Sequence, residues 1–268
     1  MKLSRNLKLI SYLTISILLL QSCEDNELIV NYNSNYPSSY SKLDSTTYLQ
    51  MKTKFAVDNP FLSTSLTIFG FCGNWDFLFS ASWPSKVPDL TESEARNTIM
   101  NFITKNSKQT GVVNPSDLTF IRVESSRVYD GSLSWFLLSR TQVYNGLEVY
   151  NSNIRFNLIN GKMTNCQGNW FPVIYIPSRI NVDEVKVKSL LLNKTVYLSD
   201  IMGRPIPMTI TVKNLESATF TKLICPIETA NKINLHVAWQ VNIPDVYYVI
   251  FVDVMTGETL GSYPTALS

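Results

Sequence analysis

Few side chains in this sequence are suited to acid–base or metal chemistry. His236 is the only histidine in 268 residues, which excludes a zinc centre with two histidine ligands. A Ser-His-Asp or Cys-His arrangement would have to use this residue. On the strand expected around it, His236 shares a face with Gln240 and Asn242, and Trp239 and Val241 lie on the other face. We therefore interpret His236 as a solvent-facing strand residue, and we predict no catalytic residue, no metal site and no cofactor.

Three cysteines, Cys72, Cys166 and Cys225, lie far apart and form no CxxC or other metal-binding spacing. Cys225 precedes Pro226 in an expected strand, and no neighbouring cation is present to lower the pKa of its thiol. One disulfide plus one free thiol would suit an oxidising compartment. Three buried thiols would suit a core, because free cysteine packs as a small apolar residue. The sequence leaves both alternatives open.

The N-terminus has the pattern of an export signal. Lys2, Arg5 and Lys8 precede an apolar run at residues 9–20, and Ser22 follows it. A membrane-spanning helix needs about 20 apolar residues, so this run is too short for one. We expect residues 1–22 to be a signal peptide.

Leu20-Gln21-Ser22-Cys23 resembles the lipoprotein box of bacteria, and the acidic stretch at 24–27 resembles the export tag of surface lipoproteins in Bacteroidetes-like bacteria. This resemblance implies that Cys23 is acylated and becomes the mature N-terminus. It also implies a lipid-anchored protein of the cell envelope, at the outer membrane and exposed at the surface. The alternative is an ordinary cleaved signal followed by a chance cysteine.

Composition favours a folded protein of nearly balanced charge over a nucleic-acid binder. Hydrophobic residues make up 45% of the chain and aromatic residues 12%, enough for a sizeable core. The formal net charge is +2, and three of the 23 basic residues lie in the expected signal peptide. A balanced charge gives no electrostatic footprint for nucleic acid.

Two segments precede the expected globular part. Residues 23–59 are rich in Asn, Ser and Tyr without a helical period, so we expect the acylated cysteine to be followed by a flexible tether. Residues 60–88 are rich in aromatic side chains, and we expect two reversing strands there with the bend at Gly73-Asn74. A core role for these aromatics is favoured over a patch for a partner.

The pattern then changes to one helix followed by strands. Thr91 and Glu94 have the spacing of a capping box, and Ala95, Ile99, Phe102 and Ile103 would form one apolar helix face. Strands are expected at about 118–128, 133–143, 150–158 and 162–171, with a type I′ turn at Asn160-Gly161.

The same plan is then repeated. Asn181 and Glu184 would cap a short helix, and strands are expected at about 195–201, 207–212, 219–227, 235–243, 247–254 and 258–262. The prediction is an α+β fold of two consecutive modules, at 89–178 and 179–268, each an antiparallel sheet with one helix packed on it.

Two stretches resemble known modules. Residues 141–150, with Tyr144, Gly146 and Tyr150, resemble the T-Q-x-Y-x-G-x-x-V-[YF] pattern of the FTP domain in thermolysin and fungalysin propeptides. In that domain a strand, a D-G or N-G turn and a returning strand follow, and Asn160-Gly161 corresponds to the turn. Residues 236–241 and 249–258 resemble the closing strands of a PepSY domain, a W-x-V strand and a V-x-D-x-x-T-G hairpin. Trp239, Asp253 and Gly257 carry that second pattern. The two resemblances cover residues 89–268.

In secreted metalloproteases these modules precede the catalytic domain, help it fold and inhibit it until cleavage. This sequence contains no HExxH motif. The resemblance therefore implies a non-enzymatic, propeptide-like lipoprotein that binds and inhibits or chaperones a separately encoded peptidase, thermolysin-like or other. The alternative is a cell-envelope surface module that binds peptides or glycans and has no protease partner. For the seven motif residues a role in turns or core is favoured over direct contact with a partner.

Overall fold

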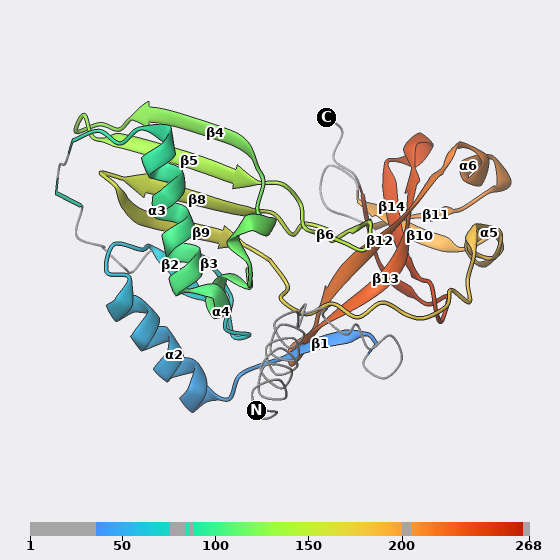
Figure 1. Ribbon diagram of the computed structural model, residues 1–268. Coiled ribbons are helices and arrows are strands. Elements are labelled where there is room, and N and C mark those ends of the chain that lie inside the picture. Colours follow the sequence, from blue (N-terminus) through green and yellow to red (C-terminus); the bar gives the residue numbers. More distant parts are fainter. Residues whose placement is uncertain (1–35, 76–83, 86–87, 200–204, 265–268) are drawn as a thin grey trace, which may run out of the picture. The chain divides into compact units, whose positions relative to one another are not determined.

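The computed structural model describes residues 36–75, 84–85, 88–199 and 205–264. Among them the α-helices are α2 (Ser45–Asp58), α3 (Glu92–Lys105), α4 (Ser107–Thr110), α5 (Glu184–Leu191) and α6 (Val212–Ser217). The strands are β1 (Ser38–Ser41), β2 (Thr64–Leu66), β3 (Cys72–Trp75), β4 (Phe120–Arg127), β5 (Leu133–Ser139), β6 (Val143–Tyr144), β7 (Leu147–Glu148), β8 (Ile154–Ile159), β9 (Lys162–Gly168), β10 (Thr195–Ser199), β11 (Pro205–Thr209), β12 (Thr219–Glu228), β13 (Lys232–Ile243), β14 (Tyr248–Asp253) and β15 (Thr259–Pro264). These strands pair antiparallel, so the α+β class is confirmed (Figure 1). No helix in the described ranges is long and apolar enough to cross a membrane.

A four-stranded sheet in the order β4-β5-β8-β9 carries α3 across one face (Figure 1). The predicted capping box starts this helix, because the Thr91 hydroxyl accepts from the Glu94 amide and the Glu94 carboxylate accepts from the Thr91 amide. The predicted apolar face is the buried one. It packs on alternate residues of the strands in a common core, whose largest fully buried members are Leu66, Ile99, Ile103, Leu137, Ile154, Phe156 and Leu158.

The turn between β8 and β9 is also as predicted. Asn160 and Gly161 both have positive φ, 49° and 70°, as a type I′ turn requires. The Asn160 side chain is buried and donates to the Ser132 hydroxyl and to the carbonyl oxygen of Pro84. This turn therefore also fixes the chain that leads into α3.

A second sheet is built around β13, which pairs with β12 along one edge and with β14 and β1 along the other. All six residues of β14 are buried, as expected for a strand covered on both faces. One face packs with α5 and α6 in a core that includes Val187, Leu191 and Leu215. A separate apolar cluster that contains Leu223, Ala238, Val249 and Phe251 covers the opposite face.

The sequence around the second sheet was predicted less well. The cap of α5 is Asp183, whose carboxylate accepts from the Lys186 amide, and not Asn181. Helix α6 was missed, and its capping box uses Thr211 and Asn214. Strand β11 consequently ends at Thr209, before the predicted limit of 212.

The prediction of a flexible tether over residues 23–59 is wrong for its second half. Strand β1 pairs with β13, and α2 follows it. Asp44 caps α2 by accepting from the Thr47 amide, and Phe55 is its buried residue. Tyr48 and Met51 pack partly buried beside Phe55, but Leu49 and Val57 are exposed, so the apolar period by which a helix is recognised is weak. The signal peptide and Cys23 lie outside the described residues.

The aromatic-rich segment does contain two reversing strands, β2 and β3, but the bend is not at Gly73-Asn74. It lies between Thr67 and Phe71, where Gly70 has a φ of 85° and the Thr67 amide donates to the Phe71 carbonyl. Phe69 and Phe71 are buried, which agrees with a core role. The remainder of the predicted ribbon, at 76–83, lies outside the described residues.

Candidate functional site

The single histidine belongs to a hydrogen-bonded network within the second sheet. His236 Nδ1 lies 2.7 Å from Asp253 Oδ2, and the Tyr36 hydroxyl lies 3.4 Å from the same oxygen. Tyr36 also accepts from the Val237 amide at 2.9 Å. The interpretation of His236 as solvent-facing is therefore wrong, since its side chain is 18% exposed and that of Asp253 3%.

Asp253 is the centre of this network. Burial raises the pKa of its carboxyl, but hydrogen bonds from His236 and from the amides of Thr256 and Met255 outweigh burial and hold the pKa below its ordinary value. The carboxylate therefore caps the turn that closes the hairpin between β14 and β15. Gly257 completes that turn with a φ of 75° and donates to the Asp253 carbonyl. Both motif residues thus have a structural role.

A cysteine also lies next to the histidine. Cys225 is directly opposite His236 in the β12–β13 ladder, so the two side chains share a face of the sheet. A Cys-His-Asp row resembles a nucleophilic site in composition. However, burial raises the pKa of the Cys225 thiol to about 12, and the residue is 3% exposed. A protonated thiol closed off from solvent is inert as a nucleophile. Among the described residues, no group of three or more His, Cys, Asp or Glu side chains could hold a metal ion.

The other motif residues do not meet in one cavity. The Trp239 indole donates to the Val182 carbonyl at 2.8 Å and so holds the segment before α5 against β13. Tyr150 lies just before β8, not within it, and its ring packs on Phe251 with centroids 5.0 Å apart. Tyr144 is part of the apolar cluster that also contains Trp239. The β6–β7 turn uses Gly146 at a φ of 78°.

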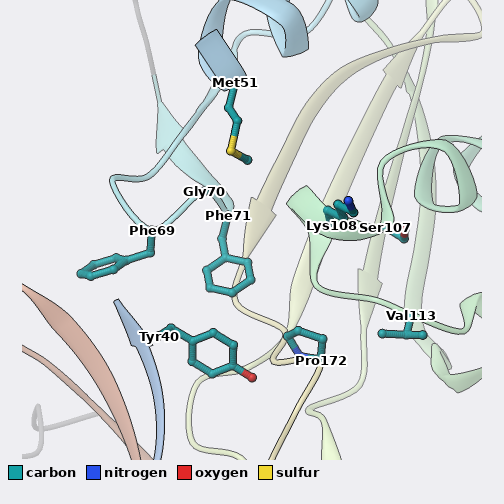
Figure 2. Close-up of a pocket in the computed structure, with 9 residues that line it drawn as sticks. All are labelled: Tyr40, Met51, Phe69, Gly70, Phe71, Ser107, Lys108, Val113 and Pro172. Atoms are coloured by element: carbon teal, nitrogen blue, oxygen red, sulfur yellow. The ribbon is translucent and has the colours of Figure 1, made fainter. Parts of the chain in front are cut away.

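An open apolar hollow lies where several distant segments meet (Figure 2). Its volume is about 280 Å³. Figure 2 shows the Phe71 ring between Met51 and Tyr40, with Pro172 and Val113 across the hollow. Its full lining is Tyr40, Met51, Phe69, Gly70, Phe71, Ser107, Lys108, Val113 and Pro172. The Tyr40 hydroxyl is engaged with the main chain of Val173, so Tyr40 presents its ring.

An adjoining hollow of about 250 Å³ is cationic. It shares Met51, Ser107 and Lys108 with the first and adds Lys54 and Lys105. Asp58 is the one carboxylate in its lining, and it pairs with Lys54 at 2.9 Å. We call the two hollows together the α2–α4 cleft. Its apolar end and its cationic end can take a large apolar group joined to an anionic one.

The first sheet offers a different kind of surface at β4. In the described part of the chain, β4 pairs with β5 alone and forms the outer edge of its sheet. The opposite edge, at β9, is covered by the β2–β3 ribbon, since the Ser63 amide donates to the Thr164 carbonyl and the Cys166 amide to the Thr64 hydroxyl. The Val128 amide donates across the hairpin to Ser132. Because amides alternate along a strand, those of Val123, Ser125 and Arg127 point away from β5.

The face of this sheet that turns away from α3 is polar with an aromatic centre. The ladder places Arg122 and Glu124 of β4 beside Leu138 and Phe136 of β5, and these beside Arg155 and Asn157 of β8. Arg122 and Glu124 form an ion pair, and the Arg122 guanidinium lies 5.5 Å from the centroid of the Phe136 ring. We call these six residues, Arg122, Glu124, Phe136, Leu138, Arg155 and Asn157, the open sheet face.

Sequence reasoning missed Met51, Lys54 and Lys108 as lining residues. Met51 and Lys54 belong to α2, which was taken for tether. Asp44, three residues before Thr47, is the cap signal from which this helix could have been found.

Comparisons with known proteins add little. A scan against protein-family models finds no match. A search of curated proteins also finds none. Among solved structures, the C-terminal domain of YpeB from Bacillus megaterium aligns over 84% of this chain and 99% of that chain, with 12% sequence identity and a TM-score of 0.29. A likeness at this TM-score carries no argument about the fold or the function of the chain.

Proposed function

We propose that this chain is a non-catalytic lipoprotein, anchored to the cell envelope through Cys23, that binds and inhibits or chaperones a separately encoded secreted peptidase. In this proposal residues 89–178 form an FTP-like module and residues 179–268 a PepSY-like module. The observation that carries the proposal is the edge of β4, to which no other described strand is paired, beside the open sheet face. A strand edge with unpaired amides is a surface to which an extended segment of another protein can be added.

The chemistry of β4 suits this use. The outward amides of Val123, Ser125 and Arg127 are spaced as donors for one extended segment of a partner. Ile121, which lies at the register shift between Phe120 and Arg122, is an exposed apolar side chain next to these donors. A peptidase segment paired with β4 would gain main-chain hydrogen bonds from the edge and side-chain contacts from the open sheet face.

The test is inhibition of secreted thermolysin-like peptidases, including those of the same organism, by the full chain in detergent. We expect saturable, sub-micromolar inhibition of one of them, about −8 kcal/mol or better. Ser125→Pro removes one outward amide and leaves the β4–β5 ladder intact. Since a hydrogen bond is worth about 1 kcal/mol, we expect inhibition to weaken by roughly 5- to 10-fold. Ser125→Ala keeps the amide and is the matched control.

Two results would contradict the proposal. Full inhibition by Ser125→Pro would show that the β4 edge is not part of the interface with the peptidase. An absence of inhibition across the panel, with a cooperatively folded protein, would show that these peptidases are not the partner.

The second candidate is a cell-envelope binding module for peptides or glycans without a protease partner, and the α2–α4 cleft favours it. Phe69 and Phe71 supply the aromatic wall and Lys108 the cation. Binding to peptide and glycan arrays, compared between the wild type and Lys108→Glu, tests this candidate. A ligand lost in Lys108→Glu but kept in Lys162→Glu, a substitution of an exposed lysine on β9, would support the cleft as its site.

A further inference from the structure

Two of the three described cysteines lie against each other in the core of the first sheet. Cys72 is on β3 and Cys166 on β9, two strands in direct contact. Both belong to one apolar cluster, in which Cys72 is 2% exposed and Cys166 0%. The bonds from Ser63 and Cys166 that fasten the β2–β3 ribbon to β9 hold the two strands in this arrangement.

The interaction between the two thiols is visible in the electrostatics of Cys166. A hydrogen bond with the Cys72 thiol, together with burial, raises the pKa of Cys166 well above its usual range. Because β3 and β9 are in direct contact and both side chains lie in one buried cluster, only a small movement of the side chains is needed to join the two sulfurs. Cys225 differs, since it lies on β12 in another cluster, with Leu223, Ala238, Val249 and Phe251. Among the described cysteines the geometry therefore selects one pair.

We propose that Cys72 and Cys166 form an intramolecular disulfide that fastens the β2–β3 ribbon to β9. The bond would form by exchange with an oxidising disulfide, either a small molecule or a protein. One cysteine thiolate attacks that disulfide and releases one thiol, and the second cysteine then attacks the mixed disulfide and releases the other. Two protein thiols are oxidised, one external disulfide is reduced to two thiols, and the two protons are transferred to the released thiolates.

The order of events follows from burial. Neither thiol is accessible to an oxidant once the core has closed, so the exchange belongs to folding, before the ribbon docks on β9. Export to an oxidising compartment rests on the proposed function, but the pairing itself does not, because it follows from the contact of β3 with β9 and from the buried cluster that the two cysteines share.

The disulfide also acts on the α2–α4 cleft. Phe69, Gly70 and Phe71 line the cleft and directly precede Cys72. A bond at Cys72 would restrict the ribbon that carries this wall. In the oxidised protein the wall formed by Phe69, Gly70 and Phe71 is then fixed to β9, the edge of the first sheet opposite β4.

The experiment uses the full chain in two preparations. One is extracted from membranes in detergent, and the other is unfolded, reduced and refolded with oxidised and reduced glutathione. Each is unfolded in guanidinium with iodoacetamide, digested without reductant and analysed by mass spectrometry. We expect a peptide in which Cys72 is joined to Cys166, and alkylated Cys225. We also expect reduction to lower the thermal unfolding midpoint by about 10 °C, a shift that is absent in Cys72→Ala and present in Cys225→Ala.

Alkylation of both Cys72 and Cys166 in both preparations would overturn the inference, as would a disulfide that includes Cys225. A Cys72–Cys166 bond in the refolded protein alone would support the pairing and would count against the oxidising compartment of the proposed function. The two proposals can therefore fail separately.

Discussion

Replacement of Asp253 tests whether the histidine network is structural. The carboxylate accepts from His236 at 2.7 Å, from the Met255 amide at 2.7 Å, from the Thr256 amide at 2.9 Å and from the Tyr36 hydroxyl at 3.4 Å. Asp253→Ala leaves all four donors without this acceptor. Asp253→Asn keeps one oxygen, which can still accept from the two amides of the turn, and loses the charge.

The magnitude follows from this count. A hydrogen bond to a charged group is worth about 1.5–3 kcal/mol, and a buried donor left without an acceptor costs about 1–3 kcal/mol. Thr256 is exposed and its amide can turn to water, so the contributions do not add fully. We expect Asp253→Ala to lower the free energy of unfolding by about 3–5 kcal/mol and Asp253→Asn by about 1–2 kcal/mol.

The pH dependence has a definite sign. The pKa of Asp253 is lower in the folded protein than its ordinary value, which is about 3.9 in an unfolded chain. The stabilisation from this carboxylate is therefore complete above about pH 5 and is lost as the pH falls through 4 towards the folded pKa. Asp253→Asn has no carboxyl to protonate and should lose less stability over the same interval.

Guanidinium unfolding followed by tryptophan fluorescence at pH 7, 5, 4 and 3 measures both effects. Glu228→Gln, which neutralises an exposed carboxylate at the end of β12, is the control for a general change in charge. A loss below about 1 kcal/mol in Asp253→Ala would refute the structural role of the network, since breaking it should cost several times more. Equal acid sensitivity in the wild type and Asp253→Asn would refute the assignment of the pH effect to this carboxyl.

Three further predictions concern the core, a loop and the anchor. Phe156 is fully buried between α3 and the first sheet. We expect Phe156→Ala to lower the free energy of unfolding by about 3–5 kcal/mol, and Phe156→Leu to lower it clearly less, in the same unfolding assay. At Gly111 a Cβ atom would lie 1.8 Å from the Trp170 carbonyl oxygen, whereas at Gly146, which also has positive φ, it would meet nothing within 4 Å; Gly111→Ala should therefore lower the unfolding midpoint well beyond Gly146→Ala, whose cost is about 1 kcal/mol, and similar midpoints would contradict the close approach. Cys23→Ser should move the protein from the membrane to the soluble fraction, because the acyl chains supply the anchoring, and retention in washed membranes would argue against acylation.

Local signals explain which parts of the fold could be predicted. The start of α3 depends on two side chains three residues apart, Thr91 and Glu94, and the β8–β9 turn on two adjacent residues. Both interactions are complete within a few residues of chain, so the sequence alone displays them. The burial of β14 on both faces is likewise predicted by its continuous apolar run.

Contacts between distant segments explain the rest. Helix α2 has a weak amphipathic pattern, because its exposed Leu49 and Val57 lie among the residues that pack inward. Met51 of this helix lines the cleft. Strand alternation led us to expect His236 to face solvent, but two distant residues cover it. Asp253 lies 17 residues further along the chain, and the ring of Tyr36 lies 6.3 Å from the imidazole ring. The α2–α4 cleft combines residues from positions 40 to 172, a set that no local pattern joins. The proposed partner and the anchor at Cys23 stay predictions.

The entry of the chain into β1 has a mechanical consequence. The described part of the chain begins at Tyr36, and β1 follows and pairs with only the Lys232–Leu235 end of β13. If the chain is anchored at Cys23, tension along it would load the hydrogen bonds of Tyr36 and the β1 ladder before the rest of the sheet, together with the bond from the Tyr175 amide to the Ser38 hydroxyl. Since β12, β14 and β15 hold the rest of that sheet without β1, detachment of four residues would release slack while the remaining sheet keeps its pairing. The anchored protein would then yield to a pull in two steps, a weak one at β1 and a stronger one at the sheet behind it.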